Sequence, residues 1–364
     1  MAAIALASAW VLGVLACGSG ARPRTPIAGC PDLSGYAACA VQEVAGPFVP
    51  RRANVLLVVE RSGRLLRVPA GATSDTWTAM TTGIAAALDR SSPNVEFALL
   101  GYPSPMSNGC GDGCCYMLPA SSAVRGPFSP ESAARIGEVL LSDQPEGEAP
   151  MAAALATARQ YLTEVDVPTA GEAFVVLVAG GGPDCNDASA CGADRCVPNL
   201  EARCASGGNC CAGAPAGCLD DQAVREQIRA LAAVGIATVV VALPGAADFT
   251  DVFDDLARAG GRPSPATGGA ISSGVNAVEI EATMTAIFAG LGARCEAPLP
   301  IQLPAPDLAR AHVVVGCEVL PAAGLRQDSG AGATRVVLEG EACTTLAQAA
   351  PRPVHVLSGC ASPP

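Results

Sequence analysis

Three segments of the chain are apolar at almost every position, and they constrain the fold more than any other feature. They are "NVLLVVE" (54–60), "AFVVLVAG" (173–180) and "IATVVVALPG" (236–245). A strand with one solvated face alternates apolar and polar residues, so an uninterrupted apolar run indicates a strand buried on both faces. Because helical patterns separate these segments, the sequence predicts a parallel sheet covered by helices on both sides.

Further segments complete this alternation of strands and helices. Ser74 or Asp75 is expected to cap the first helix, and Gly235 to end a later one. Right-handed crossovers between the strands then give a doubly wound, mostly parallel α/β fold of the Rossmann type, which binds ligands at the carboxyl ends of its strands. A fourth strand is expected at 94–103, and helices are expected at 74–89, 129–143, 150–165, 220–235, 249–261 and 277–292.

The cysteine content points to an exported protein. The chain has 17 Cys, which is far more than a reducing compartment favours. Residues 2–16 are apolar, but this run is shorter than the roughly 20 residues that span a bilayer, so it fits a signal peptide. The following "VLAC" resembles a bacterial lipobox, which predicts lipid attachment at Cys17. The alternative is an ordinary secretory signal that is cleaved nearby.

Without Cys17, an even number of Cys remains for disulfide bonds. A zinc site is the alternative for the Cys-rich segment 185–218, but its Cys spacings are irregular and no His lies nearby, which favours disulfides. The disulfide candidates are Cys30, Cys39, Cys110, Cys114, Cys115, Cys185, Cys191, Cys196, Cys204, Cys210, Cys211, Cys218, Cys295, Cys317, Cys343 and Cys360.

Composition along the chain predicts four parts. A signal peptide with its lipobox (1–17) precedes a Gly/Pro-rich tether (18–51). The α/β domain (52–294) carries the Cys-rich insert (181–219), and a β-rich extension held by two disulfides follows (295–364).

The two histidines belong to a repeated His-x₄-Cys pattern in the extension, at His312 and His355. Two similar edge strands with oxidised Cys are the favoured interpretation, and a His₂Cys₂ metal site is the alternative if the strands are adjacent.

Charge and motifs exclude several classes of function. The net charge is −12, so nucleic-acid binding, which needs a positive surface, is not expected. The sequence lacks a nucleophile elbow, a zinc-protease helix and a phosphate-binding loop, so an enzyme is not expected either.

The segments "NVLLVVERSG", "GEAPMAAAL", "VVLVAGGGPDCN", "GIATVVVALPG" and "LARAGG" occur in the order typical of a von Willebrand factor A-type domain. From about 52 to 295 the chain resembles this family. Its layout is similar to bacterial, notably myxobacterial, lipoproteins with a Cys-rich insert and a Cys-bearing β tail. The resemblance implies a Rossmann-like fold and a metal-ion-dependent adhesion site that binds a partner protein through Mg²⁺ or a similar hard cation.

This chain departs from the family's metal site at most positions. The Asp-x-Ser-x-Ser motif becomes Glu60, Ser62 and Arg64, the Thr of a second loop becomes Ala149, and the Asp after the central strand becomes Gly180. We therefore expect a degenerate site that needs no cofactor, in which the Arg64 guanidinium pairs with Glu60 and replaces the metal. The alternative is that Arg64 points to solvent.

Three nearby carboxylates keep a weak Mg²⁺ or Ca²⁺ site open as a further alternative. They are Glu148, Asp184 and Asp187. The insert follows the central strand, which predicts that it lies on the ligand-binding rim and covers or reshapes the site.

These features together predict a non-catalytic, lipid-anchored module for protein interaction or adhesion, with a protein partner that the sequence does not identify. The expected location is the bacterial cell envelope, as an outer-membrane lipoprotein, with a secreted or periplasmic protein as the alternative. Two other functions remain open: a metal-dependent adhesion module with a rearranged site, and a structural component of the envelope.

Overall fold

The computed structural model describes most of the α/β region and parts of both ends of the chain. None of the helices in the described part combines the length and apolar character needed to cross a membrane. The predicted lipid anchor Cys17 and the disulfide candidates Cys30, Cys39, Cys110 and Cys360 lie outside the described residues. The described residues are 27, 40–44, 49–105, 113–129, 131–166, 171–204, 208–299, 311–320, 326–328, 334–339, 343 and 354–358.

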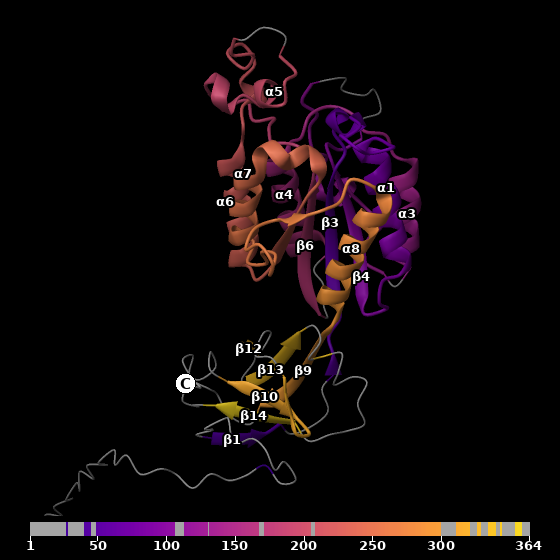
Figure 1. The fold of residues 1–364 in the computed structure, drawn as a ribbon, viewed down its shortest axis with the longest axis vertical. Coiled ribbons are helices and arrows are strands. Elements are labelled where there is room, and N and C mark those ends of the chain that lie inside the picture. Colours follow the sequence, from indigo (N-terminus) through magenta and orange to yellow (C-terminus); the bar gives the residue numbers. More distant parts are fainter. Residues whose placement is uncertain are drawn as a thin grey trace, which may run out of the picture.

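A six-stranded sheet lies at the centre of the α/β region, in the order β5-β4-β3-β6-β7-β8 (Figure 1). Its strands are parallel except for β5, which pairs antiparallel with β4 at one edge. The predicted doubly wound, mostly parallel sheet is therefore confirmed. The strands are β3 (Ala53–Glu60), β4 (Val95–Tyr102), β5 (Val124–Arg125), β6 (Glu172–Ala179), β7 (Ala237–Ala242) and β8 (Ile271–Ser272).

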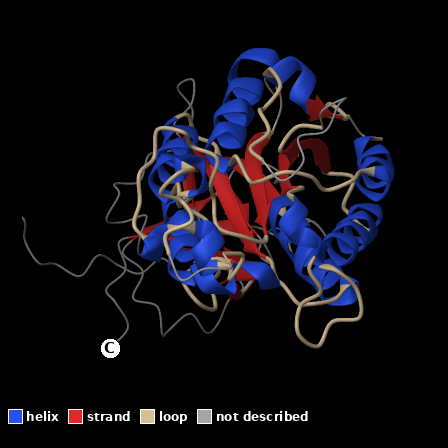
Figure 2. Cartoon of the chain, turned by 90° about the horizontal axis from the view of Figure 1, so that it is seen from above, coloured by secondary structure: helices blue, strands red, loops and turns tan. Residues whose placement is uncertain are grey.

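Helices cover both faces of this sheet, as Figure 2 shows from above. Alternate residues of β3 face opposite ways: Val55 and Leu57 pack in one apolar core, Leu56 and Val58 in the other. One face is covered by α1 (Thr76–Asp89), α3 (Ser132–Ser142) and α8 (Ala277–Gly292). The other is covered by α4 (Met151–Gln160), α6 (Asp221–Ala233) and α7 (Thr250–Ala259). Two short helices, α2 (Ala120–Ala123) and α5 (Val197–Leu200), lie in connecting segments.

The helix boundaries follow local capping chemistry. Asp75 is the N-cap of α1, because its carboxylate accepts the Thr78 N–H at 2.7 Å. Gly235 has a positive φ of 82° just after α6, the conformation expected of the glycine that ends a helix. The helix expected over 150–165 is regular only to Gln160 and continues as a π-helical turn, Tyr161–Val165.

Two small antiparallel sheets make up the C-terminal extension, in the orders β1-β14-β10-β11 and β12-β13-β9-β2. The strands β1 (Ala40–Glu43) and β2 (Val49–Pro50) come from the segment expected to be a tether, so that expectation is wrong for these residues. They pair with β14 and β9, and this pairing gives their backbone N–H and C=O groups partners. The other strands are β9 (Arg294–Leu299), β10 (His312–Val315), β11 (Glu318–Leu320), β12 (Arg326–Asp328), β13 (Thr334–Glu339) and β14 (Val354–Ser358).

The two strands that carry His312 and His355 are neighbours at the centre of their sheet, not edge strands as expected. The residue opposite His355 is Val314. Cys317, which follows β10, is disulfide-bonded, so its sulfur is not available as a thiolate ligand. The alternative of a His₂Cys₂ metal site is therefore not favoured.

Two helical glycines provide a test of the packing between α1 and α8. A Cβ on Gly83 would lie 2.7 Å from the carbonyl oxygen of Ala277 and 2.9 Å from Ile280, whereas a Cβ on Gly290 meets nothing within 4 Å. Overpacking predicts that Gly83→Ala lowers the free energy of unfolding by about 1–3 kcal/mol. Gly290→Ala should raise it by about 0.5–1 kcal/mol, because alanine favours the helix. Urea denaturation measures both, and equal shifts of the two variants would contradict this packing.

Candidate functional site

The candidate site lies at the carboxyl edge of the central sheet, where several loops meet. Strand β3 ends at Glu60 and continues into a 3₁₀ turn, Gly63–Leu66, while β6 ends at Ala179. The Gly63 N–H donates to the Gly147 carbonyl at 2.9 Å, which brings the loop before α4 to the same place. Because parallel strands end at one edge, residues far apart in the sequence converge there.

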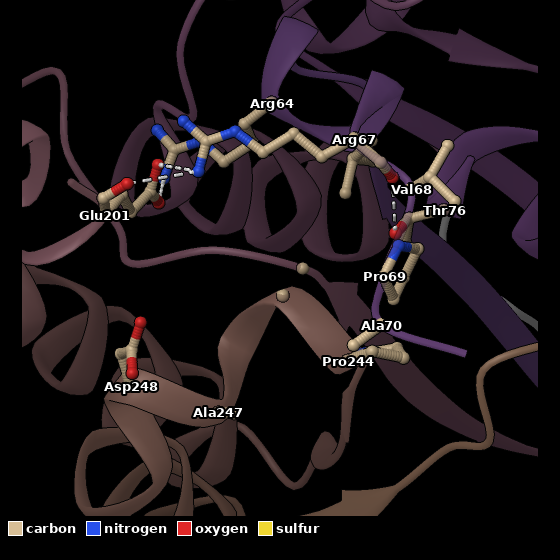
Figure 3. Close-up of a pocket in the computed structure, with 13 residues that line it drawn as sticks. Arg64, Arg67, Val68, Pro69, Ala70, Thr76, Glu201, Pro244, Ala247 and Asp248 are labelled. Atoms are coloured by element: carbon tan, nitrogen blue, oxygen red, sulfur yellow. Dashed lines mark hydrogen bonds and ion pairs between the residues drawn. The ribbon is translucent and has the colours of Figure 1, made fainter. Parts of the chain in front are cut away.

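Arg64 is the centre of this site, and only 2% of its side chain is exposed. Its guanidinium nitrogens lie 2.6 Å from Asp184 Oδ2, 2.7 Å from Glu148 Oε2 and 2.9 Å from Glu201 Oε1. Its Nε lies 3.6 Å from Glu60 Oε1. Figure 3 shows Arg64 extending toward Glu201. One guanidinium therefore contacts four carboxylates.

The four carboxylates keep this guanidinium charged. Burial alone lowers the pKa of Arg64, but Asp184, Glu60, Glu201 and Glu148 raise the pKa well above its ordinary value. The Nη1–H of Arg64 also donates to the Gly182 carbonyl at 2.7 Å. Breaking such a buried pair by removing one partner costs about 3–5 kcal/mol, because it leaves an uncompensated charge.

Glu60 is fully buried beneath Arg64. It accepts hydrogen bonds from the Ser62 hydroxyl at one oxygen and from the Gly180 N–H, at 2.7 Å, at the other. Burial raises the pKa of Glu60, although Arg64 and these two donors favour the charged form. Gly180, which stands where the family has a metal-ligating Asp, therefore binds the Glu60 carboxylate through its backbone N–H.

Asp184 is buried between Arg64 and the loop before α4. Its Oδ1 accepts the Ala149 N–H at 2.8 Å. Burial raises the pKa of Asp184 from 3.8 to about 7, although Arg64 works against the rise, and the Glu148 carboxylate adds to it. Partial burial raises the pKa of Glu148, but Arg203 and Arg64 lower it more, so the pKa lies below its ordinary value.

Besides Asp184, the insert supplies two more charged side chains to the site. Glu201 contacts Arg64, and Arg203 lies with its Nη1 2.7 Å from Glu148 Oε1 and its Nε 3.0 Å from Glu201 Oε2. The insert therefore lies at this edge of the sheet, as expected, and contacts the site directly. The sequence reasoning missed both residues. The only signal was a charged "LEAR" in a segment otherwise rich in Cys, Gly and Ala.

Disulfides hold the insert in place. Cys114–Cys185 joins the start of the insert to the segment after β4, with a Cα–Cα distance of 5.4 Å. Three more bridges lie within the insert, and one lies in the extension: Cys191–Cys218, Cys196–Cys211, Cys204–Cys210 and Cys295–Cys343. Cys115 is also disulfide-bonded. Among the described residues, the one His/Cys/Asp/Glu group with metal-like spacing is Cys191, Cys211 and Cys218, and all three are in disulfides.

Arg61, the other arginine of the motif after β3, braces the loop before α4. Its Nη1–H donates to the Pro103 carbonyl at 2.9 Å, and its guanidinium lies 3.3 Å from Asp143 and 3.4 Å from Glu146. The Glu146 N–H in turn donates to the Arg61 carbonyl at 2.8 Å. Arg61 thereby fixes the segment that carries Glu148.

The structure brings together most of the residues that the sequence singled out. Glu60, Ser62, Arg64, Glu148, Ala149, Gly180 and Asp184 all lie in the cluster. Asp187 does not, because it is exposed beyond the cluster. The alternative in which Arg64 points to solvent is wrong, since its side chain is buried.

The residues around Arg64 do not fit a divalent cation. Carboxylates suit Mg²⁺ or Ca²⁺, but here a permanently charged guanidinium contacts three of them at 2.6–2.9 Å. A second cation among the same oxygens would meet strong like-charge repulsion.

Comparison with known proteins gives only remote similarities. No protein-family model matches the chain, and no curated protein matches it. Similar solved structures include the pilus adhesin SpaC from Lactobacillus rhamnosus GG in its open conformation, with 15% identity and a TM-score of 0.45; the match covers 85% of this chain and 38% of SpaC. This chain therefore spans about two fifths of the length of SpaC.

Two further similar structures are described as von Willebrand factor domains. The vWF domain of the type V pili tip protein Mfa5 from Porphyromonas gingivalis has 11% identity and a TM-score of 0.42, over 67% of this chain and 97% of that one. A von Willebrand factor type A structure from Catenulispora acidiphila has 10% identity and a TM-score of 0.42, over 89% and 65%. Similarities this remote carry no argument about function.

The pKa of Asp184 predicts a pH dependence of stability. The folded state binds a proton at Asp184 up to about pH 7, while the unfolded chain releases it near pH 3.8. The stabilisation that this bound proton gives the folded state is therefore fully present below pH 3.8 and is lost as the pH rises to about 7. The free energy of unfolding of the wild type, relative to Asp184→Asn, should fall across this range with a slope of up to about 1.4 kcal/mol per pH unit.

Chemical denaturation of both proteins across this pH range measures the difference. Asp187→Asn is the matched control, because Asp187 is exposed and lies outside the cluster. Its difference from the wild type should stay flat. A wild-type advantage over Asp184→Asn that grows with pH would contradict the predicted protonation.

Proposed function

We propose that this chain is an exported, non-catalytic module for protein interaction or adhesion, whose binding rim is held together by an internal cation instead of a metal ion. The observation that carries this proposal is the buried Arg64 guanidinium in contact with Glu60, Glu148, Asp184 and Glu201 at the carboxyl edge of the sheet. That edge is where folds of this type bind ligands. In these terms, the site is a degenerate form of the metal-ion-dependent adhesion site that the resemblance implies.

An internal guanidinium has a different physical behaviour from a bound metal. Arginine remains charged at any physiological pH, and its position depends on folding instead of on the concentration of free ions. The loops that carry Glu148, Asp184 and Glu201 are thus held permanently around Arg64. The proposed module therefore binds its partner without divalent cations.

Disulfide chemistry supports the proposed export. Five disulfides join described residues, and such bonds persist in oxidising compartments. With the signal-like segment before Cys17, this favours the cell envelope as the location. We propose a lipid anchor at Cys17 and an outer-membrane lipoprotein, with secretion or a periplasmic location as the alternative. The α/β domain (52–294) then presents the rim, and the extension (295–364) follows it.

Affinity capture with the tagged, full-length protein tests metal independence. Membrane extracts are passed over it with Mg²⁺ and Ca²⁺ present, or with EDTA. We expect the same partner at the same stoichiometry under both conditions, because Arg64 and not a metal supports the rim. Loss of the partner in EDTA would contradict the proposal.

Two valine variants test whether the rim is the binding surface. Val68 is exposed on the loop after β3, and Val234 is exposed beyond α6, at the opposite edge of the sheet. Val68→Asp should abolish the capture, while the matched Val234→Asp should leave it unchanged. Equal effects of the two substitutions would place the contact elsewhere.

A further inference from the structure

A cavity of about 280 Å³ opens beside the Arg64 cluster, between the loop after β3 and the 3₁₀ turn Pro244–Phe249 that follows β7 (Figure 3). Gly180 and Gly245 line the cavity, and their backbones approach each other closely. A Cβ on Gly245 would lie 2.2 Å from the Gly180 carbonyl oxygen. Only glycine at position 245 allows this approach. The cavity therefore lies at the same carboxyl edge as the cluster.

The two ends of the cavity differ in chemistry. Pro69, Ala70 and Pro244 lie at one end, with Glu201 and Asp248 at the other. In Figure 3, the side chains of Arg64 and Arg67 both extend toward Glu201, and the Asp248 carboxylate lies across the open space from them. The shape suits a side chain with an apolar stem and a polar tip.

The cations at the polar end already have anionic partners. Arg64 is enclosed by four carboxylates, and Arg67 lies 3.7 Å from Glu201 Oε2. The Asp248 side chain, in contrast, is exposed and has no ion pair or hydrogen bond with any residue that the structure describes. The group that remains available to a partner at this end is therefore the Asp248 carboxylate, which is an anion.

The charge balance of the site points the same way. With Asp184 protonated below about pH 7, four ionised carboxylates face three guanidiniums, which leaves one negative charge. The ionised carboxylates are those of Glu60, Glu148, Glu201 and Asp248, and the guanidiniums are those of Arg64, Arg67 and Arg203. A cationic group is the complementary occupant, and an anionic one is repelled.

We propose that the cavity receives a cationic side chain, Arg or Lys, from the partner protein. Its charged tip pairs with Asp248, and its stem packs along Pro69, Ala70 and Pro244. Leu66 and Val68 are 56% and 61% exposed on the same loop, and they supply apolar contact to the residues beside that side chain. This inference rests on the proposed function and names the chemistry of its partner. An adhesion site with an open metal ion takes an acidic side chain, whereas this rim selects a basic one.

Two capped tripeptides test this selectivity, acetyl-Leu-Arg-Leu-amide and acetyl-Leu-Glu-Leu-amide. Each is titrated into the full-length protein and followed by NMR chemical-shift changes. We expect the Arg peptide to shift resonances around Val68 and Ala247, and to bind at least about tenfold more tightly than the Glu peptide, as one charge-assisted hydrogen bond allows. Equal affinity of the two peptides, or no shift around the cavity, would overturn the proposal.

Two aspartate variants locate the contact. Asp248→Asn removes the free carboxylate and should weaken the binding of the Arg peptide by about fivefold, which is the effect of losing one partly exposed charge pair. Asp251→Asn is the matched control, because Asp251 is exposed nearby in α7 but does not line the cavity. It should change the affinity by less than about twofold. Equal weakening by both variants would mean that the overall charge of the protein, and not this cavity, sets the affinity. That result would overturn the proposal.

The two proposals fail in different ways. If the peptide selectivity is absent while partner capture still withstands EDTA, only the basic side chain is rejected. If capture requires a divalent cation, the proposed function itself is rejected.

Discussion

The buried charge cluster around Arg64 is the interaction on which the rest of the site depends. Taking a guanidinium out of water is costly, and it is stable here because four carboxylates surround it. Glu60 ends β3, Glu148 precedes α4, Asp184 lies at the start of the insert after β6, and Glu201 lies further along the insert. One cation thus holds four points of the chain together, and their carboxylates would repel one another without it.

This arrangement connects the fold with the proposed mode of recognition. A divalent metal would leave a coordination position open to a partner's carboxylate, whereas Arg64 directs all its donors inward. What the rim offers to a partner is then its remaining acidic group, Asp248, beside an apolar loop. In the proposed function, an internal cation in place of a metal changes both the dependence on ions and the charge of the partner that fits.

Local and periodic features of the sequence were enough to predict the sheet, its main helices and most of the cluster. The apolar runs of β3, β6 and β7 required burial on both faces, and Glu60 and Arg64 are close in the chain. Glu201 and Arg203 could not be predicted, because disulfides and not a local pattern bring them back to the site. The pairing of Ala40–Glu43 with β14 was missed because strand pairing across most of the chain leaves no local signal.

Calorimetric titration of Mg²⁺ and Ca²⁺ into the wild type and into Arg64→Ser tests most directly whether Arg64 stands in place of a metal. The substitution removes the internal cation but keeps Glu60, Glu148, Asp184 and Glu201, whose oxygens suit such ions. We expect no binding to the wild type and one bound divalent cation in the folded variant. A wild type that binds a divalent cation, and loses it on Glu60→Ala, would contradict this role of Arg64.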